Sequence, residues 1–171
     1  MRKRRHSPPP DSPPEAALQG DSWQVVRIRA GDVADVIRLD HRVTGLAKPD
    51  YWRDMFERYG RRRLGERMFL VAKTVGPGTL PDVLGFIVGE VRAWEFGSAP
   101  CGWVLALSVE PQARLRGIGK ALLGALAAEF KKAGVNKMRT MVARDNQLHL
   151  LFFRSEEMMA GPYIELEKEL D

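Results

Sequence analysis

The sequence predicts one α/β domain built on a mixed sheet, and three observations support that prediction. Six β-prone runs and four helical patterns follow one another in the order β-α-α-β-β-β-α-β-α-β. Consecutive strands in the first half favour antiparallel hairpins, whereas the β-α-β units of the second half favour parallel pairing. The length of 171 residues suits one compact domain and a tail. Helices are therefore expected on both sides of the sheet.

The beginning of the chain differs in composition from the rest. Residues 1–21 are basic and contain a cluster of prolines. Such a stretch cannot bury enough apolar surface to offset the entropy lost on ordering. We therefore expect a disordered tail over residues 1–21 and a single folded domain over residues 22–171. Prolines rather than an apolar stretch follow Arg2–Arg5, so a secretory signal peptide is not expected.

Composition limits the location and the chemistry. No apolar run of about 18 residues occurs, so no membrane-spanning helix is expected. Cys101 is the single cysteine, which excludes an intramolecular disulfide and a cysteine-rich zinc site. The residues His6, His41 and His149 do not form a ligand set, so no metal is expected. A reducing, cytoplasmic compartment is the simplest fit.

One strand and two helices are expected first in the domain. Residues 23–28 are rich in β-prone side chains and are followed by a glycine turn. Asp32 is expected to cap a helix in which residues 33–40 place apolar side chains at helical spacing. Pro49 is expected in the first turn of a second helix, which Gly60 ends.

A long hairpin is expected next. Residues 68–73 and 83–94 are β-prone, and glycines and prolines at positions 76–81 mark the turn between them. Gly85 and Gly89 interrupt the second of these strands. Glycine inside a strand suggests a bulge or the close approach of another segment.

The remaining elements alternate between strand and helix. Residues 103–109 are almost all apolar, as expected for a strand buried on both faces. Residues 118–132 form a helical pattern, and Gly134 stands where a left-handed residue ends such a helix. We then expect a strand over residues 137–142, a helix over residues 148–154 and a last strand over residues 163–166. Either Asp145 or Asn146 is expected to cap the last helix.

The segment from Val104 to Lys120 carries the functional signal, because a buried strand runs into a tight loop that opens a helix. The backbone N–H groups at a helix start and the helix dipole attract anions. Gly117 and Gly119 would let a phosphate approach the backbone without a Cβ in the way. Three side chains add positive charge: Arg114, Arg116 and Lys120.

Two better-known phosphate loops do not match this segment. The Walker pattern fails, because Ala121 follows Gly119-Lys120 where Ser or Thr is required. The G-x-G-x-x-G pattern fails as well, because Leu122 occupies the third glycine position. Nucleotide hydrolysis and dinucleotide binding therefore lose their best support.

The strand, loop and helix together resemble the signature of the GNAT superfamily of N-acetyltransferases. Residues 109–111 match its Val-x-Pro and residues 114–119 match its [RQ]-x-x-G-x-[GA] loop. The resemblance covers about residues 23–171, because the order of elements also matches. It implies a mostly antiparallel sheet of six to seven strands, splayed at the fourth and fifth strands and flanked by about four helices.

The resemblance also implies acetyl-CoA as the acyl donor. The pantetheine amides would pair with the backbone of the fourth strand, and the pyrophosphate would lie on the loop at the helix start. Asn146 matches an asparagine of the family, and Phe153 stands where the family has a tyrosine. The implied cofactor-binding residues are Leu107, Val109, Arg114, Leu115, Arg116, Gly117, Ile118, Gly119, Lys120, Asn146 and Phe153.

The catalytic groups depart from the family pattern. We expect the backbone N–H of Val109 to polarise the thioester carbonyl. Phe153 cannot act as the usual tyrosine acid, so Ser155, Tyr163 or water would assist the leaving thiolate, or it would leave unassisted. Glu90 is a candidate general base, and the alternative interpretation makes it an outward-facing surface carboxylate.

The sequence therefore predicts an N-acetyltransferase that acts on a primary amine of a small molecule or protein by direct attack in a ternary complex. A non-catalytic acyl-CoA sensor is an alternative, favoured by Phe153 and by the apolar fourth strand. A second alternative is a binding module that uses the basic tail to bind RNA, DNA or an acidic protein. The basic residues from Arg58 to Arg67 would likewise suit an anionic partner. No nucleic-acid motif accompanies that charge, so a solvated surface is the simpler interpretation. A homodimer is possible.

Overall fold

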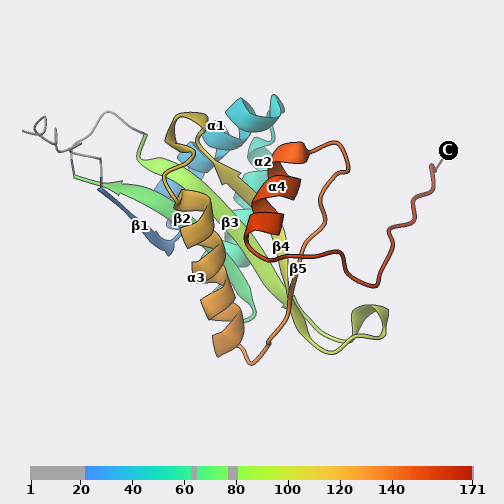
Figure 1. The fold of residues 1–171 in the computed structure, drawn as a ribbon. Coiled ribbons are helices and arrows are strands. Elements are labelled where there is room, and N and C mark those ends of the chain that lie inside the picture. The colour runs from blue at the N-terminus through green and yellow to red at the C-terminus, as the bar shows by residue number, and fades with distance from the viewer. Residues whose placement is uncertain (1–21, 63–64, 77–80, 171) are drawn as a thin grey trace, which may run out of the picture.

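The computed structural model describes residues 22–62, 65–76 and 81–170, and within them the chain forms one five-stranded sheet. The strands lie in the order β1-β2-β3-β4-β5, and all pairs are antiparallel except β4–β5 (Figure 1). This confirms the predicted mixed, mostly antiparallel sheet, with five strands instead of six or seven. The predicted tail and residues 77–80 of the predicted hairpin turn lie outside the described residues. The strands are β1 Ser22–Arg27, β2 Arg67–Val75, β3 Val83–Arg92, β4 Cys101–Val109 and β5 Met138–Arg139.

Four α-helices cover the two faces of the sheet, as predicted (Figure 1). On one face lie α1 (Val33–Thr44) and α2 (Pro49–Met55). The second half of the helix predicted from Pro49 to Gly60 is the π-helical turn η2 (Phe56–Arg61). On the other lie α3 (Ile118–Lys132) and α4 (Gln147–Ser155). None of the helices in the described ranges is long and apolar enough to cross a membrane. Three short 3-10 turns are η1 Ala30–Asp32, η3 Glu95–Gly97 and η4 Pro111–Ala113.

The α1/α2 face contains all three buried charged side chains of the described ranges. Asp40 accepts hydrogen bonds from the Trp52 indole at 2.8 Å and from the Lys48 ammonium, which ties α1 to α2. Asp32 does not cap α1 through its side chain, which corrects the prediction. Its carboxylate instead accepts from the backbone N–H of Arg29 at 2.8 Å and pairs with Lys73 of β2 at 2.5 Å. The third buried acid is Glu110.

The α3 face is apolar, and glycines on β3 and β4 let the helix approach the sheet closely. A Cβ on Gly102 would lie only 2.2 Å from a ring atom of Phe130, and one on Gly89 would lie 2.8 Å from the same ring. The strand register also shifts at Gly89, opposite β4. The expected close approach is confirmed there and at Gly85, where a Cβ would lie 3.1 Å from Leu122. Gly134, with φ +83°, follows α3 as predicted.

The sheet splays between β4 and β5. The two strands pair only at Gly102↔Met138 and Trp103↔Arg139. One residue further on, the Thr140 hydroxyl donates to the Val104 carbonyl at 3.1 Å, and the predicted strand over residues 137–142 has ended. Beyond this point the edge of β4 is not paired with any described strand.

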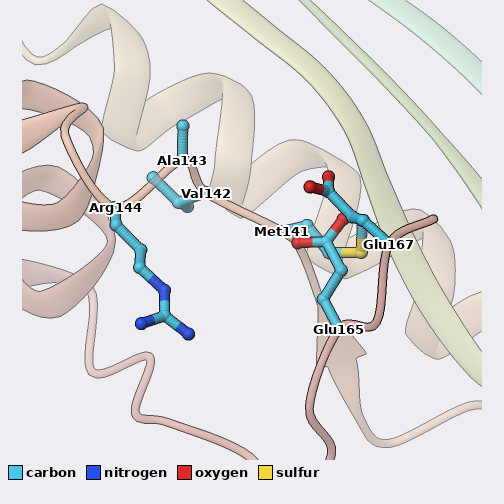
Figure 2. Close-up of a pocket in the computed structure, with 6 residues that line it drawn as sticks. All are labelled: Met141, Val142, Ala143, Arg144, Glu165 and Glu167. Carbon is cyan, nitrogen blue, oxygen red and sulfur yellow. The ribbon is translucent and has the colours of Figure 1, made fainter. Parts of the chain in front are cut away.

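The predicted strand over residues 163–166 is wrong. Its apolar alternation is present, but Ile164 and Leu166 are 84% and 85% exposed and no strand pairing forms. The adjacent chain, residues 141–144, has already left the sheet, so it offers no regular edge. A cavity of about 570 Å³ separates the two segments, with Glu165 and Glu167 on one side and Arg144 on the other (Figure 2). Tyr163 alone anchors the segment to ring and guanidinium groups, those of Phe96 and Arg139.

Candidate functional site

The loop between β4 and α3 adopts the conformation of an anion-binding turn. Leu115 and Gly117 have positive φ values of +64° and +76°, and this arrangement turns successive backbone N–H groups outward. The first i→i−4 bond of α3 runs from Ala121 N–H to the Gly117 carbonyl. The N–H groups of residues 118–120 therefore precede the helical hydrogen-bond ladder and point out of its start.

The two glycines of the loop have different roles. An added Cβ on Gly117 would meet no described atom within 4 Å, so open space lies above it. A Cβ on Gly119 would lie 3.1 Å from the Phe152 ring and 3.7 Å from Val109. Gly117 is thus the position at which a ligand could reach the backbone, whereas Gly119 allows α3 to pack against α4 and β4.

Positive charge surrounds the loop. Arg114 and Lys120 are exposed and Arg116 is half-buried. Glu156 of the chain after α4 lies near Lys120, 3.9 Å from its ammonium nitrogen. Exposed Arg114 and Lys120 thus place positive charge beside a helix N-terminus, an arrangement that favours a phosphorylated ligand.

The open edge of β4 leads directly into this loop. Glu110 N–H donates to the Leu84 carbonyl at 2.8 Å, so residue 110 faces β3. Because backbone groups alternate in direction along a strand, Val109 and Leu107 point their N–H and carbonyl groups the opposite way, into the splay. The structure therefore places the predicted backbone positions on an unpaired strand edge that leads directly into the predicted loop.

Glu90 lies on β3 opposite Trp103, the last β4 residue that pairs with β5, and three side chains hold its carboxylate. Arg92 donates to one oxygen at 2.8 Å and the Tyr59 hydroxyl donates to the other at 2.7 Å, with Arg67 at 3.7 Å. Burial raises the pKa of Glu90, but the hydrogen bonds from Arg92 and Tyr59 and the charges of both arginines outweigh it and lower the pKa overall. Burial and Glu90 together raise the pKa of Tyr59 to about 12. The carboxylate is thus a weak base with both oxygens occupied, and its role as general base stays a prediction.

The contacts that the structure gives for the candidate acids Ser155 and Tyr163 are not with the unpaired edge of β4. The Ser155 hydroxyl donates to the Phe152 carbonyl of its own helix at 2.7 Å, and Tyr163 packs near η3. Phe153 is buried in the α3 core, against the rings of Phe152 and His149. Both acid assignments therefore stay predictions.

Asn146, rather than Asp145, caps α4. Asn146 also contacts His149, to which the sequence analysis gave no role in the site. The Asn146 side-chain oxygen accepts from His149 N–H at 3.1 Å, and its amide lies 3.2 Å from His149 Nδ1. Burial and the positive charge of Arg114 lower the pKa of His149. The helix cap, the imidazole and the cationic loop thus meet in one place.

A second unpredicted feature is the ion pair between Arg42 of α1 and Glu110, at 2.5 Å. The Glu110 side chain is only 4% exposed, although it directly follows β4 and opens the loop. An acidic residue next to a buried strand suggests that a basic residue pairs with it, but the sequence does not indicate which one.

Three of the basic residues from Arg58 to Arg67 lie beside acidic side chains. Arg58 pairs with Asp54, Arg61 pairs with Glu57 at 3.1 Å, and Arg67 lies against Glu90. This local balance favours the solvated-surface interpretation of that cluster. Within the described ranges no group of three or more His, Cys, Asp or Glu side chains gathers as metal ligands would.

Solved structures with the same fold come from more than one functional class. An aminoglycoside N-acetyltransferase, AAC(6')-Iy in complex with CoA, matches with a TM-score of 0.75 and 14% identity, over 89% of this chain and 97% of that one. The AAC(6')-Ih enzyme from Acinetobacter baumannii gives 0.71 and 15% identity, over 88% and 100%. A transcriptional regulator from Bacillus halodurans C-125 gives 0.69 and 14% identity, over 87% and 100%. At this identity the likeness shows the fold alone.

Sequence comparison is more decisive for the family. A search of the curated proteins finds no match. The model of the acetyltransferase (GNAT) family, however, matches residues 33–155, which include β4, the loop, α3 and α4. That match covers more than half of the chain and includes the segment singled out from its chemistry. The chain therefore belongs to the acetyltransferase (GNAT) family.

Proposed function

We propose that the protein is an acetyl-CoA-dependent N-acetyltransferase that acylates a primary amine of a small molecule or a protein. The observation that carries the proposal is the continuity of the unpaired β4 edge with the glycine loop and the α3 N-terminus. The loop end of this arrangement suits a pyrophosphate, and the strand edge offers backbone groups for pairing. The cytoplasm, inferred from the single cysteine, and a homodimer are proposals of the same kind.

The residues present fit a CoA thioester. The N–H groups of residues 118–120, with Arg114, Arg116 and Lys120, would hold the pyrophosphate, and Leu115 and Gly117 shape the turn. The backbone of Leu107 and Val109 would pair with the pantetheine amides. Asn146 and Phe153 would contribute by fixing α4 beside the loop, since one caps that helix and the other packs it on the core.

Bound acyl-CoA would supply the activated acyl group, and the chain would supply position and polarity. Val109 N–H, directed into the splay, would donate to the thioester oxygen. Holding the amine against the thioester at this edge would supply much of the rate. Glu90 or water would take the proton of the amine, and Ser155, Tyr163 or water would assist the thiolate. The neighbours named as aminoglycoside N-acetyltransferases favour an amine acceptor.

The test is calorimetric titration of acetyl-CoA into the wild-type protein and the Gly117→Asp and Gly117→Asn variants. The two side chains match in size, and both tolerate the left-handed conformation better than other residues. The added carboxylate of Gly117→Asp should repel the pyrophosphate and weaken binding about 100-fold. Gly117→Asn should stay within about 5-fold of the wild-type protein, since it adds no charge.

Each outcome of that titration decides something. Absence of acetyl-CoA binding to the wild-type protein would sink the proposal. Binding that both variants weaken equally would place the ligand elsewhere. Binding with the expected contrast, but without turnover against any amine in a broad panel, would favour the acyl-CoA sensor over the enzyme.

CoA binding should also raise the pKa of His149. Burial and the charge of Arg114 hold this pKa below the ordinary 6.5, and a pyrophosphate beside Arg114 would offset the second cause. The protonated imidazole is then favoured in the complex. CoA binding should therefore be accompanied by proton uptake at pH values between the pKa of His149 in the free protein and its higher pKa in the complex. Proton NMR titration of the imidazole signals with and without CoA measures this, and His149→Gln assigns the signal. An unchanged or lowered pKa would contradict placement of the pyrophosphate near Arg114.

A further inference from the structure

The turn that joins β3 to β4 exposes two aromatic residues in an unfavourable backbone conformation. Trp94 and Phe96 have positive φ values of +64° and +52°, in a region that bulky side chains rarely adopt. They are nevertheless 75% and 71% exposed, and the turn extends past the end of the sheet (Figure 1). A turn that holds large apolar residues in water at a cost in backbone strain indicates a contact that the single chain does not make.

The chain after α4 continues this apolar surface. The Tyr163 ring lies 6.3 Å from the Phe96 ring, measured between the ring centroids. Arg139 of β5 contacts both segments, because its guanidinium donates to the Ser98 hydroxyl at 2.9 Å and lies 4.7 Å from the Tyr163 ring. The turn and the chain at Tyr163 are therefore neighbours on one surface.

Beyond Tyr163 the apolar side chains point to solvent. Residues 163–170 run without a turn, and within the described ranges their backbone groups make no hydrogen bond. Glu165 and Glu167 line the cavity beside residues 141–144 (Figure 2). Because alternate side chains of a drawn-out chain point in opposite directions, Ile164 and Leu166 are directed away from that cavity, which agrees with their exposure.

The exposed apolar residues of these two segments form a patch of the size that a protein interface needs. We call this set the hairpin patch: Trp94, Phe96, Tyr163, Ile164 and Leu166. Their exposed fractions correspond to about 700 Å² of side-chain surface, counted with about 150–250 Å² for each full side chain. The largest apolar patch of a typical monomer measures about 300–600 Å², whereas each partner in a stable complex covers about 800 Å².

The charges around the hairpin patch favour a second copy of the chain as its partner. Acidic residues flank the patch at Glu95, Glu165 and Glu167, and basic residues flank it at Arg92 and Arg139. A twofold contact brings the same surface of both copies together, so it requires a surface that complements itself. A border of both signs meets that requirement, whereas the acidic residues would repel an anionic membrane.

We infer that the hairpin patch is the contact surface of a homodimer. Around a twofold axis, the rings of Trp94 and Phe96 in one copy cover Ile164 and Leu166 in the other, and the reverse. Burial of these side chains offsets the strain of the turn. The inference concerns assembly, so it holds whether or not the protein transfers acetyl groups.

The test is the monomer–dimer dissociation constant of the full chain, measured by sedimentation velocity over a range of protein concentrations. Phe96→Asn removes the ring, and asparagine tolerates the left-handed conformation better than phenylalanine does, so the monomer should keep its fold. This variant should raise the dissociation constant at least about 10-fold, and Ile164→Ser should do the same. The control is Leu46→Ser, which changes an exposed apolar residue directly after α1, and Figure 1 shows α1 far from the turn. Leu46→Ser should leave the constant within about 2-fold of the wild-type value.

Each outcome of the sedimentation experiment decides the inference. Weaker dimers in both patch variants, with circular dichroism showing an intact fold and Leu46→Ser unchanged, is the expected result. A wild-type protein that stays monomeric at its highest soluble concentration would overturn the inference. If that monomer floats with phosphatidylglycerol vesicles and Phe96→Asn does not, the patch binds lipid instead. A wild-type dimer that both patch variants leave intact would place the interface on another surface, which also overturns the inference.

Discussion

Replacing Arg42 with methionine should lower the free energy of unfolding by about 2–4 kcal/mol, and Glu110→Gln should lower it clearly less. The pair is asymmetric, because the Arg42 side chain is 44% exposed whereas that of Glu110 is 4% exposed. Without Arg42, a buried carboxylate loses its cation. Without the charge of Glu110, the guanidinium turns to water and keeps its hydration. Urea denaturation at neutral pH measures both changes.

A surface pair provides the control for this prediction. Arg53 and Asp50 are 2.8 Å apart in α2, but both are largely exposed. Arg53→Met should therefore change the unfolding free energy by less than about 0.5 kcal/mol. Equal losses for Arg42→Met and Glu110→Gln would mean that the contact matters through packing and that the burial of the carboxylate does not set its cost.

Gly102→Ala should cost about 3 kcal/mol, although alanine suits a strand at least as well as glycine does. The added Cβ would lie 2.2, 2.4 and 2.5 Å from three atoms of the Phe130 ring, so α3 or the ring must shift. Phe130 is buried in the α3 core, which leaves little space for that movement. Thermal and urea denaturation should both show the loss.

Two further variants distinguish steric conflict from a general intolerance of alanine. Combining Gly102→Ala with Phe130→Leu should recover part of the loss, because the smaller side chain vacates the space. Gly124→Ala, at an exposed position of α3 with no atom within 4 Å, should stabilise the protein by about 0.5–1 kcal/mol. If the double variant is as unstable as the sum of the single ones, the contact between Gly102 and Phe130 is not the cause.

The elements predicted well are those that rest on local patterns. Residues 103–109 and 118–132 are a buried strand and a helix, and Gly134 ends that helix in the left-handed conformation. The loop between them was recognisable because its glycines and cations are contiguous in sequence. The open space at Gly117 agrees with the prediction that a phosphate could approach the backbone there.

The elements that failed depend on partners distant in sequence. The apolar alternation at residues 163–166 is a correct local signal, but a strand forms only where an unpaired edge is in reach. Arg42 and Glu110 are 68 residues apart, so no spacing rule could connect them. Glu90 was named, yet its engagement by Tyr59 and Arg92 changes its basicity, and this depends on how η2 docks on the sheet.

The two helical layers are attached to the sheet by different kinds of contact. Buried carboxylates fix the α1/α2 layer: Asp32 pairs with Lys73 of β2 and Glu110, directly after β4, pairs with Arg42 of α1, whereas Asp40 joins α1 to α2 through Trp52. In the α3/α4 layer the buried contacts are apolar, with strand glycines that accept the Phe130 ring, and the Arg27–Glu129 ion pair between β1 and α3 is partly exposed. For protein engineering, the second layer should tolerate volume-conserving redesign of several side chains at once. In the first layer each buried carboxylate depends on one partner, so the two residues of a pair must be replaced together.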